Sequence, residues 1–365
     1  MRSRRRALLS CAAVSLALVA AACSDVSSSS SGAGANVPNN SGTTINFAIN
    51  PWDGSAANVA VAEYLLQNQL GYSVNDSKVN EFAQFKQLST GDLDATLEVW
   101  PSGHADDWTN YIANDNGVVD GGQLGVIGQI GWWFPTYMLQ DHPELKTWQG
   151  LQQDWQLFET PNTPGKGTIL DGDPSYVTFD DAIAKNLGLN MQAFYSGSES
   201  AELTELDTAY SAQKPILMYF WTPHWAQAKY DMTMMKLPTV TQQCTQDAAN
   251  NADAYACGYP EDDLYKAFSD KLATKAPAAF ALLSAMQWTN DDQNGVAADI
   301  HSGMDPQDAA AKWVNANPSV WQPWVSAGMA AQSGSQVANM PAPYVVSGCS
   351  TAWSLRTGPG HRGSP

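Results

Sequence analysis

The sequence is poor in basic residues. Its 365 residues include 18 Lys and Arg against 36 Asp and Glu, which gives a formal net charge of −18. Four of the arginines, Arg2, Arg4, Arg5 and Arg6, lie at the very start, so the remainder of the chain is more acidic still. A surface of this charge repels phosphate backbones, and we therefore exclude nucleic acid as a partner.

The sequence also lacks the common motifs of catalytic, metal and phosphate sites. It holds no Gly-x-Ser-x-Gly nucleophile elbow, and its glycine pairs lack the pattern of a phosphate-binding loop. Four of the five histidines, His104, His142, His224 and His301, stand in dissimilar contexts, and none is paired at metal-ligand spacing. We therefore expect no enzyme activity, no metal and no cofactor.

Long apolar runs are missing as well, since no stretch holds 18 continuous apolar residues. A shorter apolar run, residues 7–19, follows the first arginines and precedes three alanines and Cys23. This order is typical of a secretory signal over residues 1–22. A cysteine directly after the small residues resembles a bacterial lipobox, in which Cys23 becomes the lipidated N-terminus. The alternative is an ordinary cleavage site with an incidental cysteine.

The segments that flank the folded body have little hydrophobic pattern. Residues 23–44 are rich in Ser and Gly, which is typical of a flexible tether between a membrane anchor and a folded body. Residues 343–365 are rich in Gly, Ser, Pro and Arg, and we interpret them as a disordered tail that contains Cys349. The expected location is the outer face of the cell membrane, held there by the lipid.

Two cysteines remain in the body. Cys244 and Cys257 flank a polar stretch that is typical of a surface loop. In an oxidising compartment we expect them to form a disulfide, and the alternative is two free thiols.

The body has an α/β pattern. Residues 45–49 predict a strand, residues 56–70 a helix that ends at Gly71, and residues 95–100 a strand. Strands that alternate with helices indicate a mostly parallel sheet. In such sheets ligands bind beyond the carboxyl ends of the strands.

Tryptophan is abundant, with 14 residues, and several lie at those strand ends. Trp52 and Trp100 follow two predicted strands, and Trp221 follows a third at residues 216–220. Any single tryptophan is most often a core residue. Three at the same topological position instead indicate an aromatic cage, because aromatic rings attract quaternary ammonium groups that ordinary hydrogen bonds cannot hold.

Whole segments around these tryptophans resemble the glycine betaine/choline substrate-binding proteins of ABC importers, the OpuAC/ProX-like family. The matching stretches are GDLDA with EVWP (residues 91–95 and 98–101), GWWFPTY (131–137), PILMYFWTPHW (215–225) and Leu237-Pro238. The resemblance covers roughly residues 45–332. It implies a type II periplasmic-binding-protein-like fold with two lobes, two hinge crossings, and the ligand in the cleft between the lobes.

The resemblance also implies domain boundaries. Lobe 1 would be discontinuous, over residues 45–135 and 237–342, and lobe 2 would be the insertion at 136–236. In the returning half, the pattern predicts helices over 262–275, 277–286 and 306–317. Trp321 and Trp324 lie in the stretch that follows, and we interpret both as core residues.

Carried over by position, the resemblance assigns a ligand site. Trp100 and Trp221 would be box walls and Trp52 a third; the other candidates are Trp132, Trp133, Tyr176, His224 and Asp53. Only one of Trp132 and Trp133 can face the cleft if their segment is extended. His224 would contact a ligand carboxylate, or it is a surface or hinge histidine. Asp53 would face the ligand, or it caps the following helix.

Glu98 leaves two readings open, a complement to the ligand cation or a salt bridge between the lobes. An acid in the cage would favour choline over a zwitterion, because it would repel the zwitterion's own carboxylate.

The function implied is capture of a quaternary ammonium compatible solute, glycine betaine or alternatively choline or carnitine. The protein would act as a monomer and deliver the solute to ABC permease and ATPase subunits in the membrane. The alternatives are a sugar-binding lipoprotein, since tryptophan also stacks on sugars, and a receptor dedicated to sensing.

Overall fold

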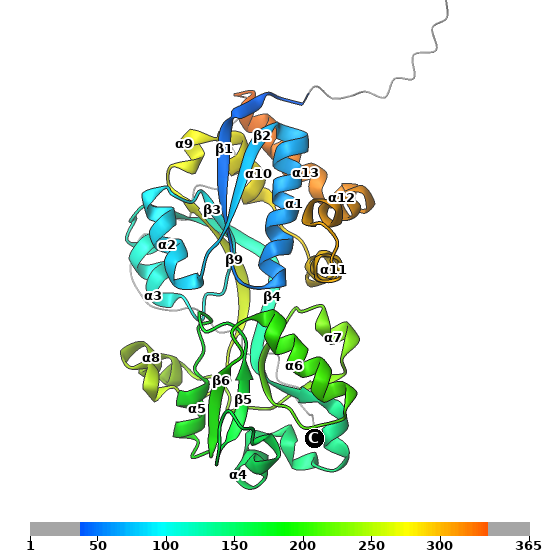
Figure 1. Cartoon of the computed structure of the whole chain (residues 1–365). Helices are drawn as coiled ribbons and strands as arrows, with labels where there is room; N and C mark the ends of the chain where they lie inside the picture. Colours follow the sequence, from blue (N-terminus) through cyan, green and yellow to red (C-terminus); the bar gives the residue numbers. More distant parts are fainter. Residues whose placement is uncertain (1–36, 335–365) are drawn as a thin grey trace, which may run out of the picture. The chain divides into compact units, whose positions relative to one another are not determined.

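The computed structural model describes residues 37–334 (Figure 1). The predicted signal peptide, Cys23, and the predicted tail with Cys349 lie outside the described residues. No helix within 37–334 is both long enough and apolar enough to cross a membrane. By their contacts, residues 37–334 belong to one compact unit.

Strands and helices alternate through the first two thirds of the body, and helices dominate its end. The strands are β1 (Asn40–Ile49), β2 (Tyr72–Lys78), β3 (Ala95–Val99), β4 (Val118–Pro135), β5 (Gly167–Asp171), β6 (Met191–Tyr195), β7 (Met218–Thr222), β8 (Met232–Met234) and β9 (Glu261–Ser269). The longer helices are α1 (Asp53–Leu70), α2 (Glu81–Thr90), α5 (Asp180–Asn186), α6 (Glu199–Ser211), α8 (Gln242–Asn250), α10 (Pro277–Ala285), α11 (Asn290–His301), α12 (Pro306–Ala316) and α13 (Pro318–Gln332). Short helical turns are α3 (Ala105–Asp107), α4 (Leu151–Asp154), α7 (Ala226–Lys229), α9 (Leu272–Lys275) and the irregular helix Trp108–Ala113.

The sheet joins two parallel groups through an antiparallel pair. Its order is β2-β1-β3-β9-β4-β7-β5-β6, with β8 paired to β4. Strands β2, β1 and β3 are mutually parallel, as are β7, β5 and β6, whereas β9 and β4 pair antiparallel with their neighbours. The long strands β4 and β9 therefore connect the two groups (Figure 1).

Helix ends follow the signals in the sequence. Gly71 and Gly91 stand directly after α1 and α2 with φ of 71° and 80°, a conformation that costs glycine little. The side chain of Asn80 caps α2 by accepting from the backbone N–H of Ala83. These caps fix where β1, β2 and β3 meet their helices, and so they position the loops that follow the strands.

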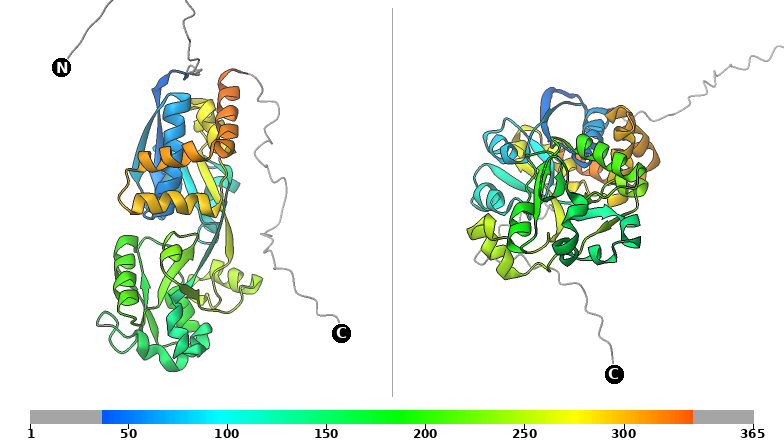
Figure 2. Two further views of the ribbon diagram at one scale, coloured as in Figure 1. Left: turned by 90° about the vertical axis from the view of Figure 1, so that its right-hand side faces the viewer. Right: turned by 60° about the horizontal axis from the view of Figure 1, so that its bottom comes forward.

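The C-terminal helices cover the first parallel group. Helices α11, α12 and α13 pack beside α1 (Figure 2). Trp324 is buried, which confirms it as a core residue, and its ring stacks on Trp313 at 6.0 Å between centroids. Trp321 is half-buried against the same core.

Four sequence predictions need correction. Trp221 does not follow its strand but lies inside it, because the strand is β7 (Met218–Thr222) rather than residues 216–220. The helix predicted over 262–275 is wrong, since most of it is strand β9 and only Leu272–Lys275 is helical. The acidic and lysine side chains favoured a helix, but in the fold this segment alternates between exposed and buried positions from Glu261 to Leu264. Strand β1 starts at Asn40, earlier than residue 45. The stretch between the cysteines begins as α8 rather than as a loop, and the predicted Cys244–Cys257 disulfide is present.

Candidate functional site

A cavity lies where loops and strands of the two parallel groups meet. Its walls are mainly aromatic: Trp52, Glu81, Trp100, Ser102, Gly103, Ile130, Tyr176, Val177, Phe179, Tyr219, Trp221 and Tyr259. Four of these, Trp52, Trp100, Tyr176 and Trp221, are residues that the sequence assigned to a cage.

Tyr176 holds the aromatic wall together. Its ring lies 6.0 Å from that of Trp52, 5.6 Å from Trp221 and 6.2 Å from Tyr219, the first two in edge-to-face contact. Its hydroxyl donates to the carbonyl of Pro51 at 3.1 Å, in the loop between β1 and α1. Tyr176 follows β5, so this contact links the two parallel groups directly at the cavity.

Glu98 holds two cage indoles in place from β3. Its Oε1 accepts from Nε1 of Trp52 at 2.7 Å and from Nε1 of Trp100 at 3.1 Å, and its Oε2 accepts from Asn58 at 2.6 Å. Burial raises the pKa of the Glu98 carboxyl to about 7, although the hydrogen bonds from both indoles oppose this. Glu98 is therefore neither a ligand contact nor a salt bridge. It positions the tryptophans.

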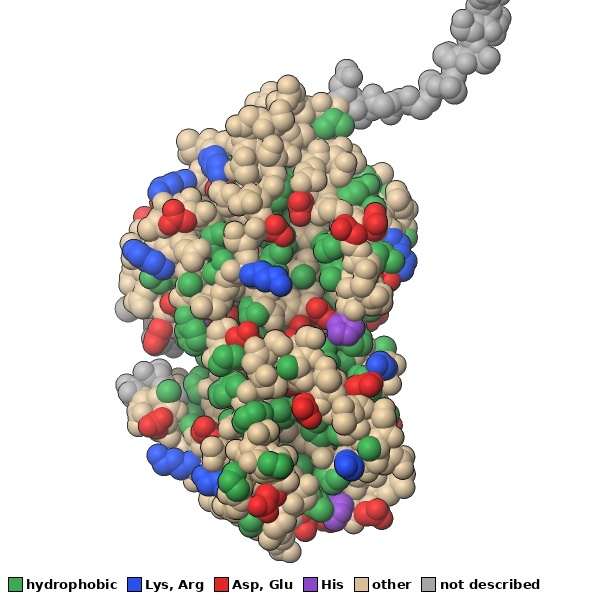
Figure 3. Space-filling model, viewed as in Figure 1, with side chains coloured by type: hydrophobic (Ala, Val, Ile, Leu, Met, Phe, Trp, Pro, Cys, Tyr) green, Lys and Arg blue, Asp and Glu red, His purple; other side chains and the backbone are tan. Residues whose placement is uncertain are grey.

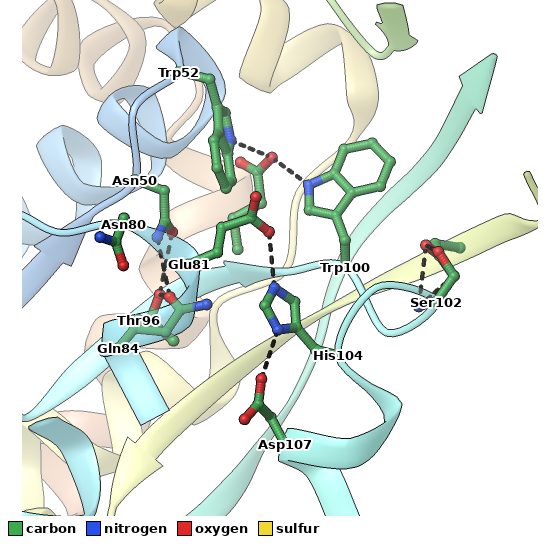
Figure 4. Close-up of polar contacts among 12 residues, drawn as sticks. Asn50, Trp52, Asn80, Glu81, Gln84, Thr96, Trp100, Ser102, His104 and Asp107 are labelled. Atoms are coloured by element: carbon green, nitrogen blue, oxygen red, sulfur yellow. Dashed lines mark hydrogen bonds and ion pairs between the residues drawn. The ribbon is translucent and has the colours of Figure 1, made fainter. Parts of the chain in front are cut away.

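Glu81 is an acid in the cavity wall that the sequence reasoning missed. It opens α2, and its Oε2 lies 2.8 Å from Nε2 of His104, whose Nδ1 lies 3.0 Å from Asp107 (Figure 4). Burial alone would lower the pKa of His104, but the hydrogen bonds to Asp107 and Glu81 raise it to about 9. A protonated His104 thus bridges two carboxylates at neutral pH, one of which lines the cavity.

Ser102 and Asp262 fix the loop after Trp100. Asp262 accepts from the backbone N–H of Ser102 at 3.3 Å and from its hydroxyl at 2.6 Å. Burial raises the pKa of Asp262 to about 6. Among the wall residues missed from sequence, only Tyr219 had a usable signal, since it lies two residues before Trp221 on the same face of β7.

The other sequence candidates do not line this cavity. Trp132 and Trp133 lie in the extended strand β4, and Ile130 of that strand forms the wall instead. Trp132 is fully buried, and its indole donates to Asp180 at 2.6 Å, which places it behind the wall residue Tyr259 that contacts the same oxygen. Trp133 is also buried, 9% exposed.

His224 is buried rather than exposed, and it already has partners. Its Nδ1 accepts from the backbone N–H of Ala226 at 3.0 Å, so the proton of a neutral ring is on Nε2, 2.7 Å from Glu199. Burial lowers the pKa of His224 to about 3, and the ring is therefore neutral at physiological pH. The interpretation as a surface histidine is wrong.

Asp53 does not cap the helix. The residue at the N-cap of α1 is Trp52, and Asp53 is already in the first turn. The carboxylate of Asp53 accepts from Nε1 of Trp225 at 2.9 Å and lies 3.0 Å from His301. These contacts point it away from the residues that line the cavity.

Gly128 of β4 offers a test of the Trp100 position. A methyl group there would overlap the six-membered ring of Trp100. We expect Gly128→Ala to displace this ring and weaken binding of a trimethylammonium ligand about tenfold, because a ring moved out of line loses part of its contact with the cation. Titration calorimetry measures the affinity. Gly295→Ala is the matched control, since its added methyl meets open space, and equal affinity of the two variants would contradict the role given to Gly128.

Comparisons with known proteins identify the family. Residues 43–316 match the family described as the substrate binding domain of ABC-type glycine betaine transport systems. The chain is 26% identical over 267 residues to the trimethylamine N-oxide-binding protein of Pelagibacter ubique, covering 70% of this chain and 82% of that protein. It is 24% identical over 285 residues to the glycine betaine/proline betaine-binding periplasmic protein of Salmonella typhimurium, covering 72% and 84%.

Solved structures show the same fold. Lactococcal OpuAC, closed on glycine betaine, aligns with a TM-score of 0.59 at 20% identity, covering 78% of this chain and 99% of that one. A choline-binding protein of an ABC transporter, in complex with choline, aligns with a TM-score of 0.62 at 19% identity, covering 80% and 97%. The predicted two-lobed, type II periplasmic-binding-protein fold is confirmed.

Proposed function

The chain belongs to the family of substrate-binding domains of ABC-type glycine betaine transport systems, and we propose that it captures glycine betaine, choline or carnitine in its aromatic cavity. Membership makes it a binding protein of an importer of quaternary ammonium compatible solutes, and not an enzyme. The solute would pass to permease and ATPase subunits in the membrane.

One observation supports a methylated ammonium as the class of ligand. Trp52, Trp100 and Trp221, which lie far apart in the sequence, line a single buried cavity together with Tyr176 and Tyr219. Their faces carry partial negative charge, so a methylated ammonium among them gains attraction without needing a hydrogen bond. The names of the relatives support the same class, because trimethylamine N-oxide and the betaines all carry a methylated nitrogen.

Calorimetric titration of the purified chain tests the proposal. The panel is glycine betaine, choline, carnitine, proline and maltose. We expect at least one of the three methylated ammonium compounds to bind, and maltose not to bind. Binding of maltose alone, or of no compound, would overturn the assignment.

We also propose that the protein is a lipoprotein anchored through Cys23 at the outer face of the cell membrane. The support is the order of arginines, apolar run and small residues directly before this cysteine. Cys23→Ala is expected to move the protein out of the membrane fraction. Retention of the variant in that fraction at the level of the unchanged chain would contradict lipid attachment at Cys23.

A further inference from the structure

The charges in the cavity wall indicate which methylated ammonium compound the cavity prefers. This inference rests on the proposed function. A betaine carries a carboxylate, which needs hydrogen-bond donors or a positive side chain in a buried site. None of the described residues that line the cavity is Lys, Arg or His. On the face drawn in Figure 3, several acidic side chains lie at the indentation between the two halves of the molecule.

Several donors in the wall are committed elsewhere, whereas the Tyr219 hydroxyl and the Trp221 indole N–H make no hydrogen bond to another described residue. Both the N–H and the hydroxyl of Ser102 bind Asp262, and the N–H of Gly103 donates to the carbonyl of Trp100. The hydroxyls of Tyr176 and Tyr259 donate to Pro51 and Asp180. His224, the residue that the family resemblance offered for a carboxylate, is hydrogen-bonded to Glu199 and lies outside the wall.

The wall also contains a hydrogen-bond acceptor, the carboxylate of Glu81. Glu81 lines the cavity and is 6% exposed; one of its oxygens is fixed by His104 at 2.8 Å, and the other makes no hydrogen bond to a described residue. His104 is held in turn by Asp107. The carboxylate is thus oriented from behind, with one oxygen left for a donor in the cavity.

We propose that Glu81 determines specificity: it accepts a hydrogen bond from the hydroxyl of a cationic trimethylammonium alcohol and repels a carboxylate, so the site prefers choline over glycine betaine. The positive nitrogen lies among the indoles, and the alcohol reaches Glu81. Glu81 is a binding residue, and His104 and Asp107 are positioning residues.

Titration with choline, glycine betaine and tetramethylammonium tests this. Tetramethylammonium has the cation but no hydroxyl, so its comparison with choline isolates the hydrogen bond without any substitution in the protein. We expect choline to bind about 10- to 100-fold more tightly than either other probe, the range for a hydrogen bond to a charged group. Glu81→Gln should lower the affinity for choline at least about tenfold and leave glycine betaine unchanged or tighter.

Glu205→Gln is the matched control, because it removes the same charge from an exposed position and should change none of the three affinities. Equal binding of choline and tetramethylammonium, or tighter binding of glycine betaine than of choline, would overturn the role of Glu81 and leave the proposed function standing. If none of the three probes binds, the proposed function itself fails, and this inference fails with it.

Discussion

Replacing Trp100 with alanine is expected to weaken binding of a trimethylammonium ligand about 30-fold or more. The indole is 7% exposed, lies in the cavity wall, and packs over Gly128, so the cation that it faces is largely free of water. A cation–π contact in such a desolvated site contributes about 2 kcal/mol or more, which converts to that factor. Trp100→Phe should lose less, since it keeps an aromatic face, although it gives up the larger indole and its hydrogen bond to Glu98.

The measurement is titration calorimetry with choline and glycine betaine, paired with thermal unfolding of each variant. Trp321→Ala is the control: Trp321 is half-buried on α13, and its indole donates to the carbonyl of Val314 rather than to any cavity residue. It should keep full affinity even if its midpoint of unfolding falls. A folded Trp100→Ala variant with unchanged affinity would remove Trp100 from the cage.

The part of the site that follows from local pattern could be predicted. Trp52 lies three residues beyond the end of β1 and Trp100 directly follows β3, and the carboxyl ends of parallel strands meet at one edge of a sheet. The alternation of strands and helices could be read from periodicity, and so could the end of α1 at Gly71. These inferences need only neighbours in the sequence.

The part of the site that depends on contacts between residues far apart in the sequence could not be predicted. Glu81 opens a helix, where an acid is ordinarily a favourable first-turn residue, and only the approach of His104 and the indoles makes it a cavity acid. Tyr259 enters the wall because β9 is a strand next to β4, and the sequence had indicated a helix just after it. Local preference for helix was overridden by pairing on both edges of β9.

His224 shows the same limit in a single side chain. Its motif placed it beside Trp221, which is correct, since the two rings are 5.2 Å apart. The direction of its hydrogen bonds is set by Glu199 at the start of α6, a residue that nothing in the motif identifies. The position of His224 in the sequence therefore predicted its contact with Trp221 but not its hydrogen bond to Glu199.

We expect ligand binding and stability to need Glu98 as a hydrogen-bond acceptor but not to need its negative charge. Glu98→Leu removes the oxygens that hold Trp52, Trp100 and Asn58. It leaves Asn58 with Gln293 as its one remaining acceptor, and it leaves both indole N–H groups buried without an acceptor. Each such donor costs about 1–3 kcal/mol, so we expect a less stable protein that binds its ligand at least about 30-fold more weakly. Glu98→Gln keeps one oxygen for the two indoles and places its amide nitrogen against Asn58. Asn58 can accept from that nitrogen by turning its unpartnered Oδ1 toward it, so the affinity should stay within a few-fold of the original.

The raised pKa of the Glu98 carboxyl predicts how the stability of the protein depends on pH. The pKa of Glu98 is raised from 4.5 to about 7 in the folded protein, chiefly by burial. Between these values the folded state binds more protons than the unfolded state, so the free energy of unfolding falls as the pH rises through this window and levels off above about 7. At about 1.4 kcal/mol per pKa unit, the ionised Glu98 costs roughly 3 kcal/mol by pH 8.

Glu98→Gln has no proton to lose at this position, so it should escape that loss. Urea unfolding at pH 5 and pH 8 gives the free energies, and the drop between the two should be smaller in the variant by roughly 3 kcal/mol. Buried acids that do not shift the pKa of Glu98, such as Asp180 and Asp262, are present in both proteins and cancel in this difference. Glu199 and Glu81 add to the shift of Glu98, so their interaction with it is part of the measured difference. An equal drop in both proteins would mean that Glu98 does not titrate in this window, whereas loss of binding in Glu98→Gln would mean that the indoles need its charge and not only its oxygen.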